Sequence, residues 1–557
     1  MDGRYQPGTG ITGRLDRDLV ELREGATRWA SLPLGGKIDL LAACRASTGS
    51  VADRWAALAA AAKGTAGTAL AGEESFTGPW ALLNALGAFM STLHQIERRE
   101  PAGLVSRPVA REPNAQIAVD VFPAGLRDRL LQLGLRGEVW MQPGVTAVNL
   151  DESIAVWYRQ GQAAPRVVAV LGAGNVTSIG PLDVLYKLVA EGSVCMLKVH
   201  PLLDYLASIF ETALGPLVRE GYVRFAYGDA ALGRHLCTHP LVDAIHVTGS
   251  EFTYRAIVAE NAAGKPITSE LGNVSPAIVL PGEWSERALR YHAEQLASAK
   301  LHNDGFNCIA LQVLVLPAGW AQREAFIAQL RRAFAAAADR VAYYPASRER
   351  CAALVAGRSG AVTFGGAGEE RIARTILSAD PNDGKEPLFS REAFGPLLAI
   401  VSLEAGDAES YLRAAVDFCN ERLRGDLAAT LIVDPQTQRD HGRAIDDAVA
   451  ALRYGCLGVN VWSGLGFALP PVPWGAYRAE GDATSPSGHG VVHNSRLLSN
   501  TQKTVLRAPF LPALPALRPP WFIAHRNQAR IGTELCALET SPSPLRFAKI
   551  AWLTLTG

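Results

Sequence analysis

From residue 166 onward, short apolar stretches alternate with stretches of helical spacing. Parallel strands need a long crossover between them, and a helix usually provides it, so this alternation predicts βαβ units and a parallel sheet. The strands expected here are Val167 to Leu171, Ser193 to Leu197, Val223 to Tyr227 and Ala244 to Val247, and the helices are Pro181 to Glu191 and Tyr205 to Arg219. No other feature of the chain limits its fold as strongly.

The alternation restarts after Pro281 and predicts a second α/β unit. Its elements are a helix over 285–300, a strand over 309–316, a helix over 320–338 and a strand over 397–403. Together the two stretches predict an α/β fold with two doubly wound parallel-sheet domains.

The remaining stretches differ in pattern. Residues 1–115 read as mostly helical, although the helical spacing of 37–63 is interrupted by Ser47-Thr48-Gly49-Ser50, and Ser50 looks like the start of a new helix. Residues 116–160 alternate and carry turns, which favours short β-ribbons. The tail is proline-rich from Pro509 and shows no clear periodicity.

The composition excludes several classes of protein. Hydrophobic residues make up 48% and charged residues 19%, as in an ordinary globular protein, and 54 Lys+Arg balance 54 Asp+Glu. A chain without net charge has no field that favours nucleic acid or an anionic membrane. No apolar run predicts a membrane span, and the first ten residues show no secretory signal, so we expect a cytoplasmic protein. The eight cysteines are scattered and suggest neither a zinc site nor a disulfide framework.

Cys308 ends a polar, glycine-containing loop (NDGFNC, 303–308) that runs into the predicted strand from Ile309 to Pro317. A junction of this kind can aim a side chain while leaving it accessible. Free cysteines are among the most buried residue types, however, so Cys308 alone would more often be a structural residue.

A glycine-containing turn follows the strand from Val167 to Leu171 (GAGNV, 172–176). It fits the dinucleotide fingerprint G-x-G-x-x-G poorly, because Thr177 replaces the third glycine. Lys198 also ends the next strand, where an acidic residue would be expected to bind a ribose.

Further segments complete a pattern in a fixed order. They are HPLVDAIHVTGS (239–250), SELGNVSP (269–276), EAFGP (392–396) and PWGAY (473–477). With Asn175, Gly192, Lys198 and the loop before Cys308, they make the chain from about 30 to 510 resemble the aldehyde dehydrogenase superfamily. Each segment alone is weak, but six in the same order are specific.

The resemblance implies a role for each matched residue. Cys308 would be the nucleophile, Glu270 the general base and Asn175 an oxyanion donor, and Trp474 would line the tunnel for the aldehyde. The residues implied in NAD or NADP binding are Lys198, Gly249, Ser250, Thr248, Leu271, Glu392, Phe394 and Gly174. No metal is implied.

The resemblance also implies a division of the chain. The expected parts are an N-terminal helical part (1–115), a β-ribbon for oligomerisation (116–160), an NAD(P)-binding domain (161–281), a catalytic domain (282–490), a return strand to the ribbon (491–510) and an extension of unknown role (511–557). An exposed two-stranded ribbon has unpaired edges, so we expect a homodimer or homotetramer.

These residue types suit oxidation of an aldehyde to an acid. A thiolate adds to the carbonyl, amide donors stabilise the oxyanion, a hydride leaves to the nicotinamide, and a carboxylate activates water to hydrolyse the thioester. Two alternatives stay open: an enzyme that transfers the acyl group to coenzyme A or reduces an acyl-CoA, and an inactive binding protein. The intact Asn175, Glu270 and Cys308 argue against the second.

The chain departs from the family pattern at several positions. Ala173-Gly174 replaces the usual Pro-Trp before the asparagine, and Phe306 replaces a glutamine. Val199, His200 and Pro201 follow Lys198 without the acidic residue that repels a 2′-phosphate, so we expect NADP to be accepted, alone or with NAD.

Overall fold

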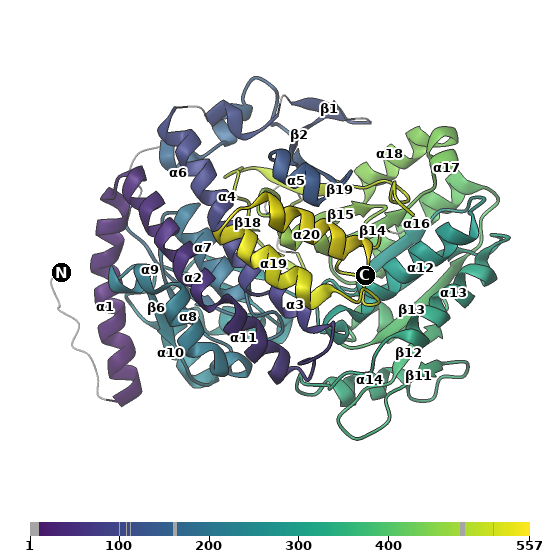
Figure 1. The fold of residues 1–557 in the computed structure, drawn as a ribbon, viewed down its shortest axis with the longest axis horizontal. Coiled ribbons are helices and arrows are strands. Elements are labelled where there is room, and N and C mark those ends of the chain that lie inside the picture. The colour runs from purple at the N-terminus through teal and green to yellow at the C-terminus, as the bar shows by residue number, and fades with distance from the viewer. Residues whose placement is uncertain are drawn as a thin grey trace.

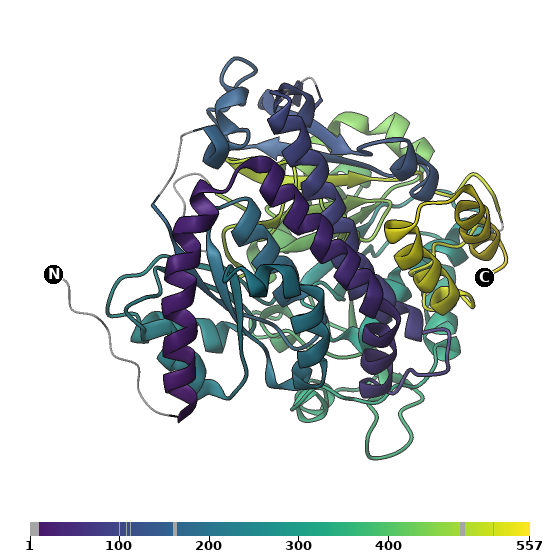
Figure 2. The same ribbon diagram turned by 60° about the vertical axis from the view of Figure 1, so that its left-hand side comes forward.

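The computed structural model describes residues 10–99, 101–106, 108–111, 113–159, 164–479, 485–515 and 517–557. Within these ranges the strands form one eleven-stranded, one six-stranded and one two-stranded sheet, flanked by helices (Figures 1 and 2). The chain has the α/β fold with parallel-sheet domains that the alternation predicted. None of the described helices is both long and apolar enough to cross a membrane.

The six-stranded sheet carries the first predicted alternation. In spatial order its strands are β17 (Gly488–His489), β8 (Ile267–Glu270), β7 (Ala244–Thr248), β4 (Val167–Leu171), β5 (Val194–Lys198) and β6 (Val223–Ala226). Neighbours from β8 to β6 pair in parallel, and β17 pairs antiparallel with β8 at this sheet's edge. Because β4 and β5 are buried along nearly their whole length, their sequences are continuous apolar runs.

The eleven-stranded sheet contains the second alternation. In spatial order its strands are β1 (Val109–Arg111), β2 (Gln116–Phe122), β3 (Arg136–Met141), β19 (Thr501–Arg507), β15 (Cys456–Val459), β14 (Ala428–Ile432), β9 (Ser275–Val279), β10 (Leu311–Pro317), β13 (Leu397–Leu403), β12 (Arg374–Ser378) and β11 (Val362–Phe364). Pairing is parallel from β19 to β12 and antiparallel at both ends. β9, in the stretch predicted as cofactor-binding, therefore belongs to this larger sheet.

The predicted ribbon has a partner within its own chain. β2 and β3 pair with each other, β3 pairs with β19, and β19 pairs on its other side with β15. Both edges of the return strand are thus filled by the same chain. Among the described residues the outer edge of this arm is β1, which pairs with β2 on one side, so the expectation of a second subunit stays a prediction.

The helices follow the predicted order. Their bounds are α1 (Gly10–Ser31), α2 (Leu34–Ala62), α3 (Ala71–Phe76), α4 (Pro79–Glu97), α5 (Leu126–Leu131), α6 (Val156–Arg159), α7 (Ile179–Val189), α8 (Ala207–Ala213), α9 (Gly215–Arg219), α10 (Ala230–Thr238), α11 (Glu251–Glu260), α12 (Glu286–Leu301), α13 (Arg323–Ala336), α14 (Ser347–Val355), α15 (Pro387–Ser390), α16 (Ala408–Arg422), α17 (Pro435–Asp440), α18 (Gly442–Ala451), α19 (Gln528–Thr540) and α20 (Pro544–Leu555). Short 3₁₀ turns cover Pro101–Leu104, Leu150–Ser153, Pro201–Leu206, His302–Gly305 and Ser463–Ala468. A two-stranded sheet joins β16 (Pro473–Trp474) to β18 (Val492–His493).

The predicted interruption at 47–50 is wrong, because α2 runs through it without a break. Its buried face continues through Cys44, Thr48 and Ala52, so packing outweighs the low helix propensity of the polar run. Gly49 faces α19, and a Cβ there would collide with Thr540.

The tail, where no periodicity was found, forms helices α19 and α20. They lie side by side and cover α2, α3 and α4, the yellow helices beside the purple ones in Figure 1. Eight of the thirteen residues of α19 are buried, and because these include the polar Gln528, Glu534 and Glu539, its sequence shows no apolar stripe. Their apolar side chains join a separate core cluster that includes Trp80, Leu83, Ile531 and Leu538.

Candidate active site

Cys308 and Glu270 meet between the two large sheets. Glu270 is the last residue of β8, and Cys308 follows the 3₁₀ turn His302–Gly305 and precedes β10. The Cys308 Sγ–H donates to Glu270 Oε1 across 3.8 Å. Cys308 is half-buried, whereas the other seven cysteines are buried. Burial raises the pKa of the Cys308 thiol well above its usual range, and the carboxylates of Glu270 and Glu392 raise it further, so the resting residue is a thiol.

Glu270 is buried, and its two oxygens have different surroundings. Oε1 accepts the indole N–H of Trp474 at 2.7 Å, whereas Oε2 has no hydrogen-bond partner among the described residues. Burial raises the pKa of Glu270 to about 8, and Asp183 raises it too, against the hydrogen bonds from Trp474 and Cys308. A carboxyl group that titrates near neutral pH is suited to proton transfer.

Asn175 lies in the loop between β4 and α7 and contacts the segment before Cys308. Its Nδ2 donates to the Phe306 carbonyl at 3.0 Å, which leaves the second N–H of the amide for a substrate oxygen. The Asn175 carbonyl accepts from Lys63 Nζ at 2.9 Å, Asn303 Nδ2 at 3.0 Å and the Tyr343 hydroxyl at 3.0 Å. Three donors on one carbonyl fix this loop against the segment before Cys308.

The turn before Cys308 has an unusual backbone. Asn303, Asp304 and Gly305 have φ values of 53°, 53° and 76°, all left-handed. This conformation costs about 1–2 kcal/mol for a residue with a side chain, although Asn and Asp tolerate it better than most. The Asn303 N–H donates to Glu73 Oε2 at 3.0 Å, and Arg340 binds both oxygens of Glu73 at 2.6 Å. We call Glu73 and Arg340 the clamp of the turn.

Several of the residues predicted to bind the cofactor lie at the carboxyl ends of strands in the six-stranded sheet. Lys198 ends β5, and burial lowers its pKa while Asp204 and Asp229 raise it. Thr248 ends β7 and donates to Asp183 Oδ2 at 3.0 Å. Ser250 caps α11 by accepting the Thr253 N–H at 3.1 Å, and the Gly249 N–H donates to the Glu270 carbonyl at 3.0 Å. The start of α11 is thereby tied to the backbone of the candidate base.

Glu392 supplies a second buried carboxylate. Its Oε1 has no hydrogen-bond partner in the described structure, and burial raises its pKa to about 7 against Arg350 and Lys300. A Cβ at Gly272 would collide with its Oε2, so glycine is needed beside it. A buried acceptor without a partner, together with the amine of Lys198, fits the hydroxyl groups of a ribose.

The other predicted cofactor residues contribute shape. A Cβ at Gly174 would collide with the ring of His200, so only glycine allows the loop to pass there. The Leu271 N–H donates to the Ser487 carbonyl at 2.8 Å. Phe394 packs edge-on against Tyr344, with ring centroids 4.7 Å apart, and joins the rings around the buried Phe306. The residues predicted to bind the cofactor therefore lie at strand ends of the six-stranded sheet or in loops next to strands and helices.

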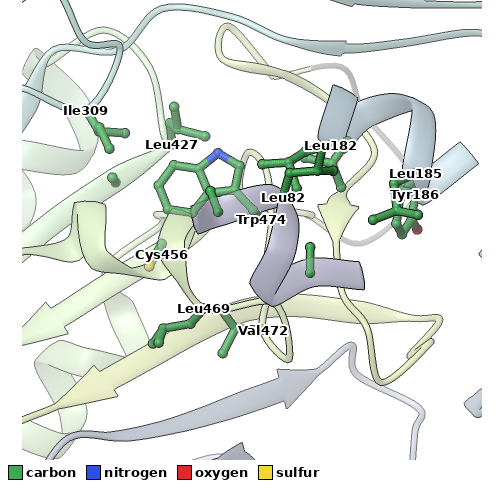
Figure 3. Close-up of a cluster of buried hydrophobic side chains, with 14 of the residues drawn as sticks. Leu82, Leu182, Leu185, Tyr186, Ile309, Leu427, Cys456, Leu469, Val472 and Trp474 are labelled. Atoms are coloured by element: carbon green, nitrogen blue, oxygen red, sulfur yellow. The ribbon is translucent and has the colours of Figure 1, made fainter. Parts of the chain in front are cut away.

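Trp474 was predicted to line the aldehyde tunnel. Its side chain is fully buried in a cluster of apolar side chains that includes Cys456, Leu469 and Val472 (Figure 3). Its N–H points at Glu270, so the contact that the structure shows is with the candidate base. Contact with an aldehyde stays a prediction.

One group of potential metal ligands was not noticed in the sequence. Asp16 Oδ1 lies 3.1 Å from His235 Nε2 and 3.3 Å from His239 Nε2, and the three residues could offer one ligand atom each. The Leu241 N–H donates to His239 Nδ1 at 3.1 Å, so the neutral ring carries its proton on Nε2. A protonated Nε2 donates to Asp16 and has no lone pair for a metal, so the group acts as a hydrogen-bonded tie between α1 and α10.

Several residues around the site could not be singled out from the sequence. Lys63, Glu73, Arg340 and Tyr343 act on Asn175 or Asn303 from more than 35 positions away, and no local pattern marks them. The Asn-Asp-Gly run at 303–305 does carry a signal, because all three residue types tolerate a left-handed backbone. That signal could have identified the turn.

The comparisons with known proteins agree with the fold. A sequence model described as the aldehyde dehydrogenase family matches residues 184–479. The chain is 29% identical over 289 residues to a geranial dehydrogenase from Castellaniella defragrans, covering 46% of this chain and 56% of that protein. It is 33% identical over 137 residues to a betaine aldehyde dehydrogenase from Vibrio vulnificus, covering 24% and 23%. The matches thus span about half or less of these curated relatives.

Solved structures match over most of the chain. A gamma-glutamyl-gamma-aminobutyraldehyde dehydrogenase from Burkholderia cenocepacia superposes with a TM-score of 0.60 at 18% identity, covering 89% of each chain. A lactaldehyde dehydrogenase from Escherichia coli superposes with a TM-score of 0.61 at 16% identity, covering 90% and 92%. At such identities the likeness establishes the shared fold.

Proposed function

This chain belongs to the aldehyde dehydrogenase family, and on that premise we propose that it oxidises an aldehyde to a carboxylic acid with NAD or NADP. The observation that carries the proposal is the approach of Cys308 Sγ to Glu270 Oε1 at 3.8 Å, beside the amide of Asn175. A nucleophile, a proton acceptor and an oxyanion donor are the groups that this reaction requires.

The first step is addition of Cys308 to the aldehyde carbonyl. Because burial keeps the thiol protonated, Glu270 accepts its proton as the C–S bond forms. The carbonyl oxygen becomes an oxyanion, and the free N–H of Asn175 and the backbone N–H of Cys308 stabilise it. Such donors contribute about 10²–10³ in rate each when they are aimed at the developing charge.

The second step converts the adduct to a thioester on Cys308. A nicotinamide cofactor, when bound, would supply the acceptor for the hydride that leaves the former carbonyl carbon. The residues that would hold the cofactor are Lys198, Glu392, Phe394, Leu271, Gly174 and the start of α11 at Thr248, Gly249 and Ser250.

The third step is hydrolysis of the thioester. After the Cys308 proton has passed from Glu270 to solvent, Glu270 removes a proton from water and the hydroxide oxygen bonds to the acyl carbon. The C–S bond then breaks, which releases the acid and leaves Cys308 as a thiolate that takes up a proton. Water is a poor nucleophile and needs such a base, whereas coenzyme A can attack as its thiolate. The buried Glu270 beside Cys308 therefore favours hydrolysis over acyl transfer.

A panel of aldehydes with NAD and with NADP, each with and without coenzyme A, tests the proposal. We expect formation of reduced cofactor and free acid by the wild type, and none by Cys308→Ala, which should still bind the cofactor. Strong acceleration by coenzyme A would assign the acyl-transfer reaction instead. Cofactor binding without turnover on any aldehyde would favour an inactive binding protein.

Homodimer or homotetramer formation and a cytoplasmic location stay predictions. Exposed leucines beside the ribbon, Leu126, Leu130 and Leu133, support assembly, because a second subunit would cover them. Light scattering at micromolar concentration tests it, and Leu130→Asp should shift any dimer towards monomer. A wild-type monomer would contradict the prediction.

A further inference from the structure

In the PWGAY segment (473–477), Trp474 carries an indole nitrogen, which gives it a hydrogen-bond donor that an apolar aromatic ring lacks. The ring donates its N–H to Glu270 Oε1 at 2.7 Å. We infer that Trp474 is a positioning residue, which holds the carboxylate of Glu270 beside Cys308 and favours its ionised form. The inference rests on the proposed function, because it assigns to Glu270 the role of base.

The surroundings of the indole fix the direction of this hydrogen bond. Trp474 ends β16, and the neighbouring Pro473 carbonyl accepts the Thr504 hydroxyl at 2.9 Å. The Trp474 ring packs edge-on against Phe467, with centroids 5.9 Å apart, and a Cβ at Gly466 would lie 3.1 Å from it. Figure 3 shows the indole within this buried cluster. The N–H has no access to water, so Glu270 is its partner rather than one choice among several.

The groups that face Glu270 act in opposite directions. Asp183 of α7 opposes ionisation, and burial opposes it more strongly, whereas the Trp474 N–H and the Cys308 thiol favour it. Asp183 is itself engaged by the Thr248 hydroxyl at 3.0 Å and lies 3.4 Å from His246 Nε2.

Burial lowers the pKa of His493 of β18 to about 4, although the nearby Asp183 raises it. His493 is therefore neutral at neutral pH and adds no positive charge near the site. Glu270 Oε2 lacks a partner among the described residues. The described donors to the ionised carboxylate are therefore the Trp474 N–H and the Cys308 thiol, and of these two only Trp474 keeps its proton through the reaction.

Loss of the indole N–H should raise the pH at which Glu270 ionises. A hydrogen bond to a charged group corresponds to a shift of about one to two pH units. At neutral pH each unit lowers the ionised fraction of Glu270 about tenfold, and the steps that need this base slow to the same extent. Phenylalanine keeps most of the apolar volume of the ring, so Trp474→Phe isolates the donor.

Alkylation of Cys308 by iodoacetamide measures this without any aldehyde. Cys308 is half-buried, whereas the other seven cysteines are buried, so mass spectrometry can follow the labelling of Cys308 specifically. Because Glu270 accepts the thiol proton, the labelling rate should rise with pH as Glu270 ionises. We expect the midpoint of this rise to move up by about one to two pH units in Trp474→Phe, and the step to vanish in Glu270→Gln.

Phe467→Leu is the matched control, because it loosens packing against the same ring but keeps the N–H. Its midpoint should stay at the wild-type value, and an equal shift in both variants would overturn the inference in favour of packing. If Trp474→Phe does not fold, as judged by circular dichroism, the indole ¹⁵N–H resonance of the wild type provides the test. The chemical shift of this resonance should change with pH around the same midpoint as the labelling rate, and this change should disappear in Glu270→Gln. A chemical shift that does not change around this midpoint overturns the inference.

The two proposals fail separately. An unmoved midpoint in Trp474→Phe, with aldehyde oxidation intact in the wild type, overturns the role of Trp474 alone. Absence of aldehyde oxidation in the wild type, with the expected shift in labelling, overturns the proposed function and leaves the Trp474–Glu270 contact as measured.

Discussion

Glu270 occupies a position that favours chemistry over stability. Burial raises its pKa in the folded chain to about 8, above the ordinary value of 4.5 that applies to the unfolded chain. Below pH 4.5 both states hold the proton and no cost arises. Between pH 4.5 and 8 only the unfolded state ionises, so folding loses about 1.4 kcal/mol per pH unit. The penalty reaches its plateau above pH 8.

Glu270→Gln should therefore stabilise the protein, and more so at high pH. Glutamine has the same shape but no ionisation, so its advantage over the wild type should grow from pH 5 to pH 8 and then level off. Denaturant unfolding of both proteins across this range measures the difference in free energy of unfolding. A constant difference at all pH values would show that Glu270 is ionised throughout.

At the residue scale the sequence singled out three candidate residues that the structure brings together, but it missed the residues that support them. Cys308, Glu270 and Asn175 belong to short motifs in a fixed order, and the structure brings them together. The contacts from Lys63 and Tyr343 to the Asn175 carbonyl join segments more than 110 residues apart in sequence. Such contacts leave no local pattern, because they depend on where the whole chain folds.

At the scale of elements, the end of β5 bears on the choice of cofactor. Lys198 is followed by His200, whose Nδ1 accepts the Leu202 N–H at 3.2 Å and whose pKa burial lowers to about 4. A neutral ring here does not repel a 2′-phosphate, although Asp204 and Asp229 lie close enough to affect Lys198.

We expect NADP to bind, and His200→Glu to weaken NADP at least tenfold more than NAD, because a carboxylate and a phosphate repel each other. Fluorescence titration with both cofactors measures the two dissociation constants. Thr238→Glu, at the exposed last residue of α10, serves as a control for added charge. Binding of NAD alone by the wild type would contradict the expectation.

The turn before Cys308 depends on its clamp. The Glu73 carboxylate and the Arg340 guanidinium are both buried, and although burial opposes ionisation of Glu73, Arg340 and His302 hold its pKa down at about 2. Removal of one partner from a buried pair costs about 3–5 kcal/mol, because the other charge stays buried.

Arg340→Leu should thus lower the free energy of unfolding by several kcal/mol and slow turnover, since the left-handed backbone of Asn303 loses its support. Arg358→Leu breaks a comparable bidentate pair with Glu386 that is partly exposed and should cost about 1 kcal/mol or less. Equal effects of the two substitutions on stability and turnover would show that the clamp has no special role.

Prediction of elements succeeded where periodicity was strong and failed where packing overrode it. The strands β4, β5, β10 and β13 lie within a few residues of their predicted positions, because buried strands read as apolar runs. The polar residues 47–50 do not interrupt α2, since a neighbouring helix packs against them. α19 escaped detection because its buried residues include polar ones, so that no apolar stripe marks the helix.

At the scale of the whole molecule, the C-terminal tail is a structural part of the fold. Glu539 of α19 binds Arg45 of α2 and Arg127 of α5, and accepts the Trp80 N–H of α4 at 3.2 Å. Trp80, Leu83, Ile531, Leu538 and Leu553 share one core cluster.

Truncation after Phe510 should expose this cluster and leave the protein aggregated or less stable by several kcal/mol, because each large buried apolar side chain contributes about 1.5–3 kcal/mol. Size-exclusion chromatography and thermal unfolding measure this. Glu539→Gln in the full chain serves as a milder test that keeps the apolar contacts. A truncated protein as stable as the full chain would show that the packing of the tail does not contribute to the free energy of unfolding.

The packing of α19 on α2, α3 and α4 also determines when this part of the protein can fold during translation. Translation releases α2, α3 and α4 early, but the helix that closes over them emerges hundreds of residues later. While ribosomes elongate the chain at about 5–20 residues per second, Trp80 and Leu83 have no partner from the tail. This part of the fold can therefore be completed only after α19 has been made, and nascent chains that stall before it leave Trp80 and Leu83 without these partners.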